Sequence, residues 1–203
     1  MIDTGIVVAI ITSILGPVIV VLLNTRLNKK KKGGDMVADA LAVSDKIMTK
    51  LDYIKDEFKA DRVWLAQFHN GGHFYPTGKS IAKFSMVYEI VESTTKSIQS
   101  NFQNIPVSLF SKPINHLLEK EVIEIPDYRD ETVATYGLKY IAEDAGSKST
   151  YMFAIKTIDN KFIGVMTLDF TRKRVQLDHD QVNIIHNHAT AIGGVLNTHL
   201  HKN

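Results

Sequence analysis

The hydrophobic pattern divides the chain into two unequal parts. Between Asp3 and Arg26, the sequence TGIVVAIITSILGPVIVVLLNT contains no charged residue over 22 positions. As an α-helix this run would measure about 33 Å, which matches a hydrocarbon core of roughly 30 Å. The run therefore predicts a transmembrane helix. A cleaved signal peptide fits poorly, because the basic residues follow the apolar run instead of preceding it.

The residues around the predicted span set its orientation. Four lysines follow it, namely Lys29, Lys30, Lys31 and Lys32. The positive-inside rule then places the N-terminus outside and the rest of the chain in the cytoplasm, as in a single-pass protein of an inner or plasma membrane. The same lysines can bind anionic lipid headgroups. Small residues share one face of the span and favour helix packing and a homo-oligomer; they are Gly5, Ala9, Ser13 and Gly16.

After the lysines, helical and strand periods alternate. Asp35 is placed to cap a helix whose apolar positions recur to about Lys59. A strand is predicted over 62–69, with a turn at Asn70-Gly71-Gly72 and a second strand over 84–91. A short helix from residue 111 and a strand over 121–126 follow.

The C-terminal part has the clearest pattern. A helix is predicted over 131–146, and two strands, 149–158 and 161–170, are joined by a short turn at Asp159-Asn160. The last helix begins at Asp178, and Gln181 three residues later completes a capping box. Strand hairpins between helices predict an α+β domain with an antiparallel sheet flanked by helices. The expected division is residues 1–32, anchor and basic flank, and residues 33–203, soluble domain.

Composition narrows the possible chemistry. The chain has no cysteine, which excludes thiol catalysis, cysteine-ligated zinc and disulfides. Five of the 24 Lys and Arg residues, but one of the 22 Asp and Glu residues, lie in residues 1–32, so the body is mildly acidic and we expect no nucleic-acid partner. Since no P-loop, GxGxxG or Gly-x-Ser-x-Gly motif occurs, we also expect neither an enzyme nor a cofactor.

From about residue 35, the order of elements resembles that of a GAF domain, a small sensory module of regulatory proteins with a GAF/PAS-like sheet. The resemblance rests on VIEIPD before a helix, on AGSKSTYMFAIKTIDNKFIGVMTLDF, and on a capped closing helix that contains AIGG. Such domains bind small molecules beside one face of the sheet or serve as dimerising modules. The resemblance implies that a ligand pocket would use Asp127, Tyr128, Tyr151, Phe153, Thr167 and Asp169.

The most unusual local motif is His69-Asn70-Gly71-Gly72-His73. Two imidazoles beside a Gly-Gly turn could contact a small molecule or a partner, and glycine would let a ligand approach the backbone closely. The alternative is a turn with a structural role alone. A metal site is not expected, because no third ligand follows at a fixed spacing.

Two functions remain open. The first is a single-pass, membrane-anchored GAF-like sensor or interaction module for signalling, which contacts the lipid bilayer, itself and a protein partner. The second comes from a resemblance in architecture to the holin of T-even phages, whose soluble domain is periplasmic and is bound by an antiholin. The shared features are the N-terminal span and the hairpin strands followed by a capped helix. The lysine run argues for the first, since it favours a cytoplasmic domain.

Overall fold

The computed structural model describes residues 16–29 and 35–200. The chain divides into two units between residues 39 and 40, and the first contains helix α2 (Gly16–Lys29). In the described part of the chain, no helix is long and apolar enough to cross a membrane. The span predicted over residues 4–25 includes residues 1–15, which lie outside the described residues, and the same holds for Gly5, Ala9, Ser13, Lys30, Lys31 and Lys32. Gly16 begins α2 and Lys29 ends it.

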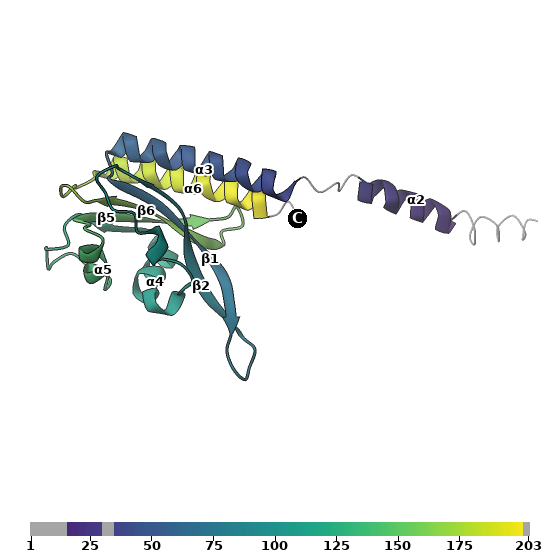
Figure 1. Cartoon of the computed structure of the whole chain (residues 1–203), viewed down its shortest axis with the longest axis horizontal. Helices are drawn as coiled ribbons and strands as arrows, with labels where there is room; N and C mark the ends of the chain where they lie inside the picture. The colour runs from purple at the N-terminus through teal and green to yellow at the C-terminus, as the bar shows by residue number, and fades with distance from the viewer. Residues whose placement is uncertain (1–15, 30–34, 201–203) are drawn as a thin grey trace, which may run out of the picture. The chain divides into compact units, whose positions relative to one another are not determined.

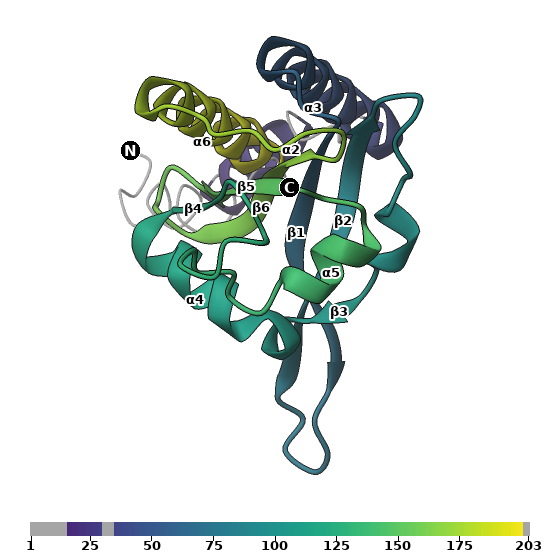
Figure 2. The same cartoon turned by 90° about the vertical axis from the view of Figure 1, so that its left-hand side faces the viewer.

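The second unit is built on a six-stranded antiparallel sheet with the order β3-β2-β1-β6-β5-β4 (Figures 1 and 2). This confirms the predicted α+β class. The strands are β1 (Arg62–His73), β2 (Ser80–Val91), β3 (Ile105–Pro106), β4 (Val122–Ile125), β5 (Ser149–Lys156) and β6 (Phe162–Phe170). Two long helices lie side by side on one face, α3 (Met36–Phe58) and α6 (His179–Leu200). The other face carries α4 (Ser111–Lys120), α5 (Lys139–Asp144) and two short 3₁₀ turns, η2 (Gln99–Asn101) and η3 (Val107–Phe110).

Alternation along the strands produces two hydrophobic cores. On β5, Tyr151 and Phe153 pack beneath α3 and α6, whereas Met152 between them packs on the opposite face. Successive strand residues point to opposite faces, so a strand buried on both sides supplies both cores. The second core lies beneath α4 and α5, and it is the one that contains a cavity.

Local signals predicted the starts of α3 and α6 correctly. Asp35 Oδ1 accepts a hydrogen bond from the backbone N–H of Val37 at 2.9 Å, which caps the first turn of α3. At α6, the backbone N–H of Gln181 donates to Asp178 Oδ1 at 2.8 Å, and the backbone N–H of Asp178 donates to Gln181 Oε1 at 3.0 Å. The capping box is therefore confirmed.

The predicted turn at Asn70-Gly71-Gly72 is wrong. β1 continues through these residues to His73, and the chain reverses between Phe74 and Lys79, where the N–H of Phe74 donates to the carbonyl of Lys79 at 2.8 Å. The two glycines are accommodated by an irregularity in the β1–β2 pairing between residues 70 and 73. Glycine thus marks a bulge here, not a reversal. The resulting β1–β2 hairpin extends away from the rest of the domain (Figures 1 and 2).

The predicted helix over 131–146 is also too long. α5 spans only Lys139–Asp144, because Tyr136 and Gly137 both have positive φ, at 53° and 82°, and interrupt the helical pattern. Strand β3 was not predicted from the sequence, since its two residues are too few to show an alternating pattern.

Two glycines permit close contacts of the backbone. A Cβ on Gly193 of α6 would lie 2.1 Å from the carbonyl oxygen of Lys156, and one on Gly164 of β6 would lie 2.3 Å from that of Ala66. By contrast, Gly194 has nothing within 4 Å of such a Cβ. Gly193 therefore sets the distance between α6 and the end of β5.

Candidate functional site

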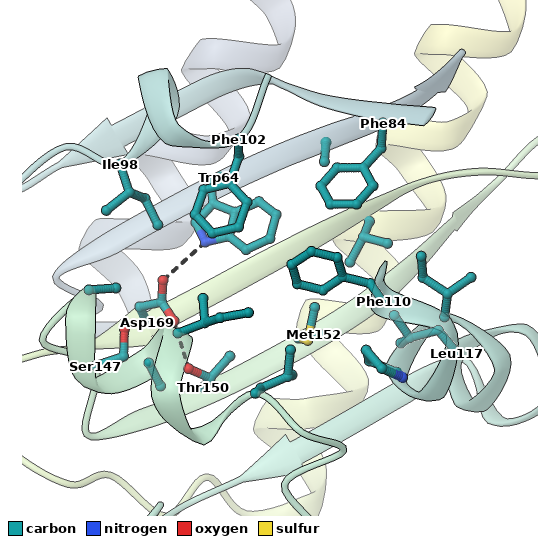
Figure 3. A pocket seen from close by; sticks show the side chains of 18 of the residues that line it. Trp64, Phe84, Ile98, Phe102, Phe110, Leu117, Ser147, Thr150, Met152 and Asp169 are labelled. Atoms are coloured by element: carbon teal, nitrogen blue, oxygen red, sulfur yellow. Dashed lines mark hydrogen bonds between the residues drawn. The ribbon is translucent and has the colours of Figure 1, made fainter. Parts of the chain in front are cut away.

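An apolar cavity of about 70 Å³ lies on the sheet face covered by α4 and α5 (Figure 3). Its walls come from β1, β2, β5 and β6, from the segment 98–110, and from the two short helices. The side chains are mostly apolar, and several are aromatic; they include Trp64, Phe84, Ile98, Phe102, Phe110, Leu117, Met152 and Val165.

Aromatic pairs define the shape of this cavity. Trp64 and Phe102 stack with ring centroids 6.2 Å apart, and Phe84 meets Phe110 edge to face at 5.2 Å. Such offset or perpendicular arrangements are those that aromatic quadrupoles favour. They hold the segment 98–110 against β1 and β2, so that a loop far away in sequence becomes one wall of the site.

Asp169 forms the polar end of the cavity. Its Oδ2 accepts a hydrogen bond from Trp64 Nε1 at 3.0 Å, and its Oδ1 accepts from Thr150 Oγ1 at 2.7 Å (Figure 3). Oδ2 also accepts from Arg62 Nε at 2.9 Å. The carboxylate is nearly fully buried. Since a buried charge is tolerated only when it is paired and hydrogen-bonded, these three donors explain how Asp169 can lie there.

The guanidinium of Arg62 is fully buried and donates hydrogen bonds to several segments of the chain. Besides Asp169, it donates to the carbonyl of Lys96 and to Ser147 Oγ, both at 2.9 Å, and to the carbonyl of Ala145 at 3.4 Å. Arg62 thereby fixes the loop after β2 and the end of α5 to the sheet. Its role is to hold the walls of the cavity in place.

Tyr128 and Thr167 carry hydroxyl groups near this end of the cavity. Burial raises the pKa of the Tyr128 phenol well above its usual range, which keeps this cavity-lining side chain neutral. Thr167 lies opposite Trp64 on β1 and Met152 on β5, so it shares the cavity face of the sheet. Its Oγ1 is buried and has no hydrogen-bond partner among the described residues.

The structure distributes the residues expected from the GAF resemblance over three places. Tyr128 and Asp169 line the cavity, and Asp127 lies in a cleft next to it. Tyr151 and Phe153 do not line the cavity, since strand alternation turns them toward α3 and α6. The Tyr151 hydroxyl instead donates to the carbonyl of Val175 at 2.9 Å. The placement expected for these two residues is therefore corrected.

The histidine motif is separate from the cavity. His69 Nε2 lies 2.9 Å from Ser85 Oγ across the β1–β2 hairpin, and His73 ends β1 beside the hairpin loop. None of the five residues His69, Asn70, Gly71, Gly72 and His73 lines the cavity. Within the described ranges, no group of three or more His, Asp or Glu side chains is arranged to hold a metal ion. Whether the motif contacts a ligand or partner stays a prediction.

Sequence reasoning missed most of the cavity. The single tryptophan of the chain, Trp64, sits in its wall. Arg62, which begins the same strand, indicates a buried ion pair, because a charge at the edge of a strongly apolar strand needs a buried partner. Phe102 lies in a polar segment and Phe110 in the short run IPVSLF, and neither stretch has a clear period that would place these residues in a core.

Comparisons with known proteins identify the fold. No protein-family model and no curated protein matches the chain. Among solved structures, a far-red cyanobacteriochrome photoreceptor matches with a TM-score of 0.62 and 13% identity over 89% of this chain and 98% of its own. The blue-light-absorbing form of the PixJ GAF domain of Thermosynechococcus elongatus matches with a TM-score of 0.62 and 12% identity, over 79% and 88% of the two chains. The fold is that of a GAF domain.

A third similar structure contains a bound ligand, with which the size of the present cavity can be compared. It is a far-red-absorbing dark state with bound biliverdin IXa, with a TM-score of 0.61 and 13% identity over 88% of this chain and 99% of its own. A biliverdin contains four pyrrole rings, whereas the present cavity of about 70 Å³ is about half of the roughly 150 Å³ that holds one benzene ring. With no cysteine for attachment either, the residues of this GAF fold do not fit a bilin.

Proposed function

We propose that this chain is a membrane-anchored regulatory module whose GAF-like domain binds a small molecule in the apolar cavity. The observation that carries the proposal is the cavity itself, which combines an apolar lining with a buried polar end formed by Asp169, Thr150 and Trp64. Concave apolar sites with a few fixed polar groups are the usual form of small-molecule sites. The module acts by binding and not by catalysis.

The volume of the cavity limits its ligand. About 70 Å³ accommodates an apolar group of roughly three or four carbon atoms, judged against the cavity that holds benzene. Very small ligands gain at most about 1.5 kcal/mol per non-hydrogen atom, so a ligand of this size binds no more tightly than tens of micromolar.

The anchoring belongs to the same proposal. The uncharged run of residues 4–25 and the four lysines after it support a single membrane span, with the N-terminus outside and the GAF-like domain in the cytoplasm. The small residues of the span support self-association, and the domain then meets a protein partner at the membrane. The phage holin alternative rests on architecture, and nothing in the described ranges favours it.

Quenching of Trp64 fluorescence tests the cavity. Trp64 is the single tryptophan, so the fluorescence of the full chain in neutral detergent micelles reports on the wall of the cavity. The quencher is 2,2,2-trichloroethanol, which acts by contact and carries one compact CCl₃ group. We expect saturable quenching that Ala142→Leu, which fills the cavity, abolishes. The matched control is Ala191→Leu, on the exposed face of α6, which should leave saturation unchanged. Linear, unsaturable quenching in the wild-type chain would refute the proposal.

Topology is tested separately at the tip of the β1–β2 hairpin. Tyr75 is 97% exposed, and the chain has no native cysteine, so Tyr75→Cys gives one reactive thiol. We expect no reaction with a membrane-impermeant maleimide in intact cells and full reaction after permeabilisation. Labelling in intact cells would place the domain outside and reverse the proposed orientation.

A further inference from the structure

A polar cleft of about 250 Å³ adjoins the apolar cavity. Tyr128 and Ser147 line both spaces, so the cavity and the cleft adjoin at these two residues. The cavity side is apolar, and the cleft side is rich in charged side chains. The two spaces are therefore neighbours with opposite chemical character.

Three cations from separate segments meet in this cleft. Arg129 follows β4, Lys148 precedes β5, and Arg174 follows β6; the fold brings these three strand ends together at one edge of the domain. The lining carboxylates are Asp127 and Glu143. The run Arg172-Lys173-Arg174 reads as an ordinary basic loop in sequence, but the structure separates Arg174 from its neighbours and directs it into the cleft.

Asp127 positions the two arginines. Its Oδ1 accepts from Arg174 Nε at 2.7 Å, and its Oδ2 accepts from Arg129 Nη2 at 2.9 Å. These arginines hold the pKa of the Asp127 carboxyl well below its usual range, with the hydrogen bonds from Arg129 as the main cause. Asp127 therefore stays ionised at neutral pH and fixes both guanidinium groups at the cleft.

Donors remain available after these bonds are formed. Arg174 uses only Nε on Asp127, and its two Nη groups have no partner in the part of the chain that the structure describes. Lys148 Nζ donates to the carbonyl of Arg172 at 2.6 Å, and an ammonium group has two further N–H bonds. A guanidinium whose Nη groups are free and whose orientation is fixed is well suited to a carboxylate or phosphate group.

We infer that the ligand of this domain is a small amphipathic acid, with its apolar body in the cavity and its anionic group in the cleft against Arg174 and Lys148. This inference rests on the proposed function, since it specifies the ligand of the same cavity. Ligands of this class have two features: an apolar group of a few carbon atoms, and one carboxylate or phosphate group attached directly to that apolar group. Tyr128 and Ser147, which face both spaces, lie beside the junction between the two parts.

A matched pair of quenchers tests the inference. Trichloroacetate and 2,2,2-trichloroethanol carry the same CCl₃ group, but only the first is an anion at neutral pH, and both report on Trp64 in the full chain. Because one charge-assisted contact is gained, we expect trichloroacetate to half-saturate at a concentration about tenfold lower than trichloroethanol. The double variant Lys148→Gln/Arg174→Gln should reduce this preference to about twofold or less, and Lys173→Gln, an exposed cation outside the cleft, should retain it.

The outcomes separate the two proposals. If neither quencher saturates, the proposed function fails and the inference fails with it. If both saturate at equal concentrations, the cavity binds but the cleft does not take part, and the inference alone is overturned. The same conclusion follows if the double variant keeps the tenfold preference. A measurement on the wild-type chain does not depend on the folding of the variants. Its preference for trichloroacetate over trichloroethanol should shrink as the sodium chloride concentration rises from about 0.05 to about 0.5 M. A preference that salt leaves unchanged would count against the cleft.

Discussion

Arg62 and Asp169 lie directly opposite each other on β1 and β6, and Arg62 Nε donates to Asp169 Oδ2 over 2.9 Å. Both side chains are buried beside the mainly apolar core on this face. The pair joins two central strands at the polar end of the cavity. Removing one partner would leave the other charge buried without compensation, which is costly even where the pair itself adds little stability.

We therefore predict that Asp169→Asn lowers the free energy of unfolding by about 3–5 kcal/mol, because Arg62 keeps its charge and loses its counterion. Urea denaturation followed by far-ultraviolet circular dichroism measures the change. The control is Asp127→Asn, whose partners Arg129 and Arg174 are reached by solvent, and which should cost far less because water screens these pairs. Equal losses for the two variants would show that the burial of the pair does not matter.

Adjacent glycines on α6 should respond in opposite directions to the same substitution. Gly193→Ala places a methyl group against the backbone of Lys156, which cannot move aside, so we expect a destabilisation of about 1–3 kcal/mol from the forced shift. Gly194→Ala meets open space and should stabilise the helix by up to about 1 kcal/mol. Thermal unfolding of the two variants side by side measures this difference, and a gain in stability from Gly193→Ala would contradict the packing.

His188 should make the domain less stable in mild acid. Burial lowers the pKa of its imidazole below the usual value of about 6.5, and Lys50 acts in the same direction while Glu57 opposes it. The unfolded chain then binds more protons than the folded one below about pH 6.5, so stability is complete above that pH and is lost as the pH falls through the folded pKa. Urea midpoints between pH 7.5 and 5 should fall less steeply in His188→Gln than in the wild-type chain. The exposed His179 provides the control, since His179→Gln should preserve the steep fall.

Glu89 should control the loop that closes the cavity. Its carboxylate accepts hydrogen bonds from the backbone N–H groups of Ile98 at 2.9 Å and Gln99 at 3.3 Å and from the hydroxyl of Ser97. Removing such a cap from a short helical turn typically costs about 1 kcal/mol. We expect Glu89→Ala to loosen Ile98 and Phe102 and to increase the access of iodide to Trp64. Glu119→Ala, at an exposed site on α4, should leave iodide quenching as it is.

The parts of the fold that the sequence predicted correctly are those determined by neighbours in the chain. The capping of α3 by Asp35, the capping box of α6 and the β5–β6 hairpin each depend on residues within a few positions of each other. The hairpin turn also contains Asn160 at φ 59°, a conformation that asparagine tolerates well. By contrast, Gly71-Gly72 signals a turn locally, but Asn70 and His73 on either side pair with β2 and keep the chain in the strand.

The candidate site was less predictable because distant segments build it. Tyr128 and Asp169 were expected from the GAF resemblance, and the structure places both in the cavity wall. Phe102 and Phe110 enter the wall only because the chain between β2 and α4 folds back over the sheet, which no local period encodes. The cleft has the same origin, since Arg129, Lys148 and Arg174 are brought together by three different strand ends.

The two long helices run in opposite directions, so that α3 begins at the end of the domain where α6 finishes (Figure 1). Near that end, Val43 and Leu196 pack into the same core. A short linker could therefore join Leu200 to Asp35, with new chain ends opened at the exposed Asp159-Asn160 turn. Such a circular permutant keeps every strand pairing of the sheet while releasing the domain from the segment that precedes it. The place at which the chain enters the domain is thus a matter of chain order, and the same architecture would accept a different entry point.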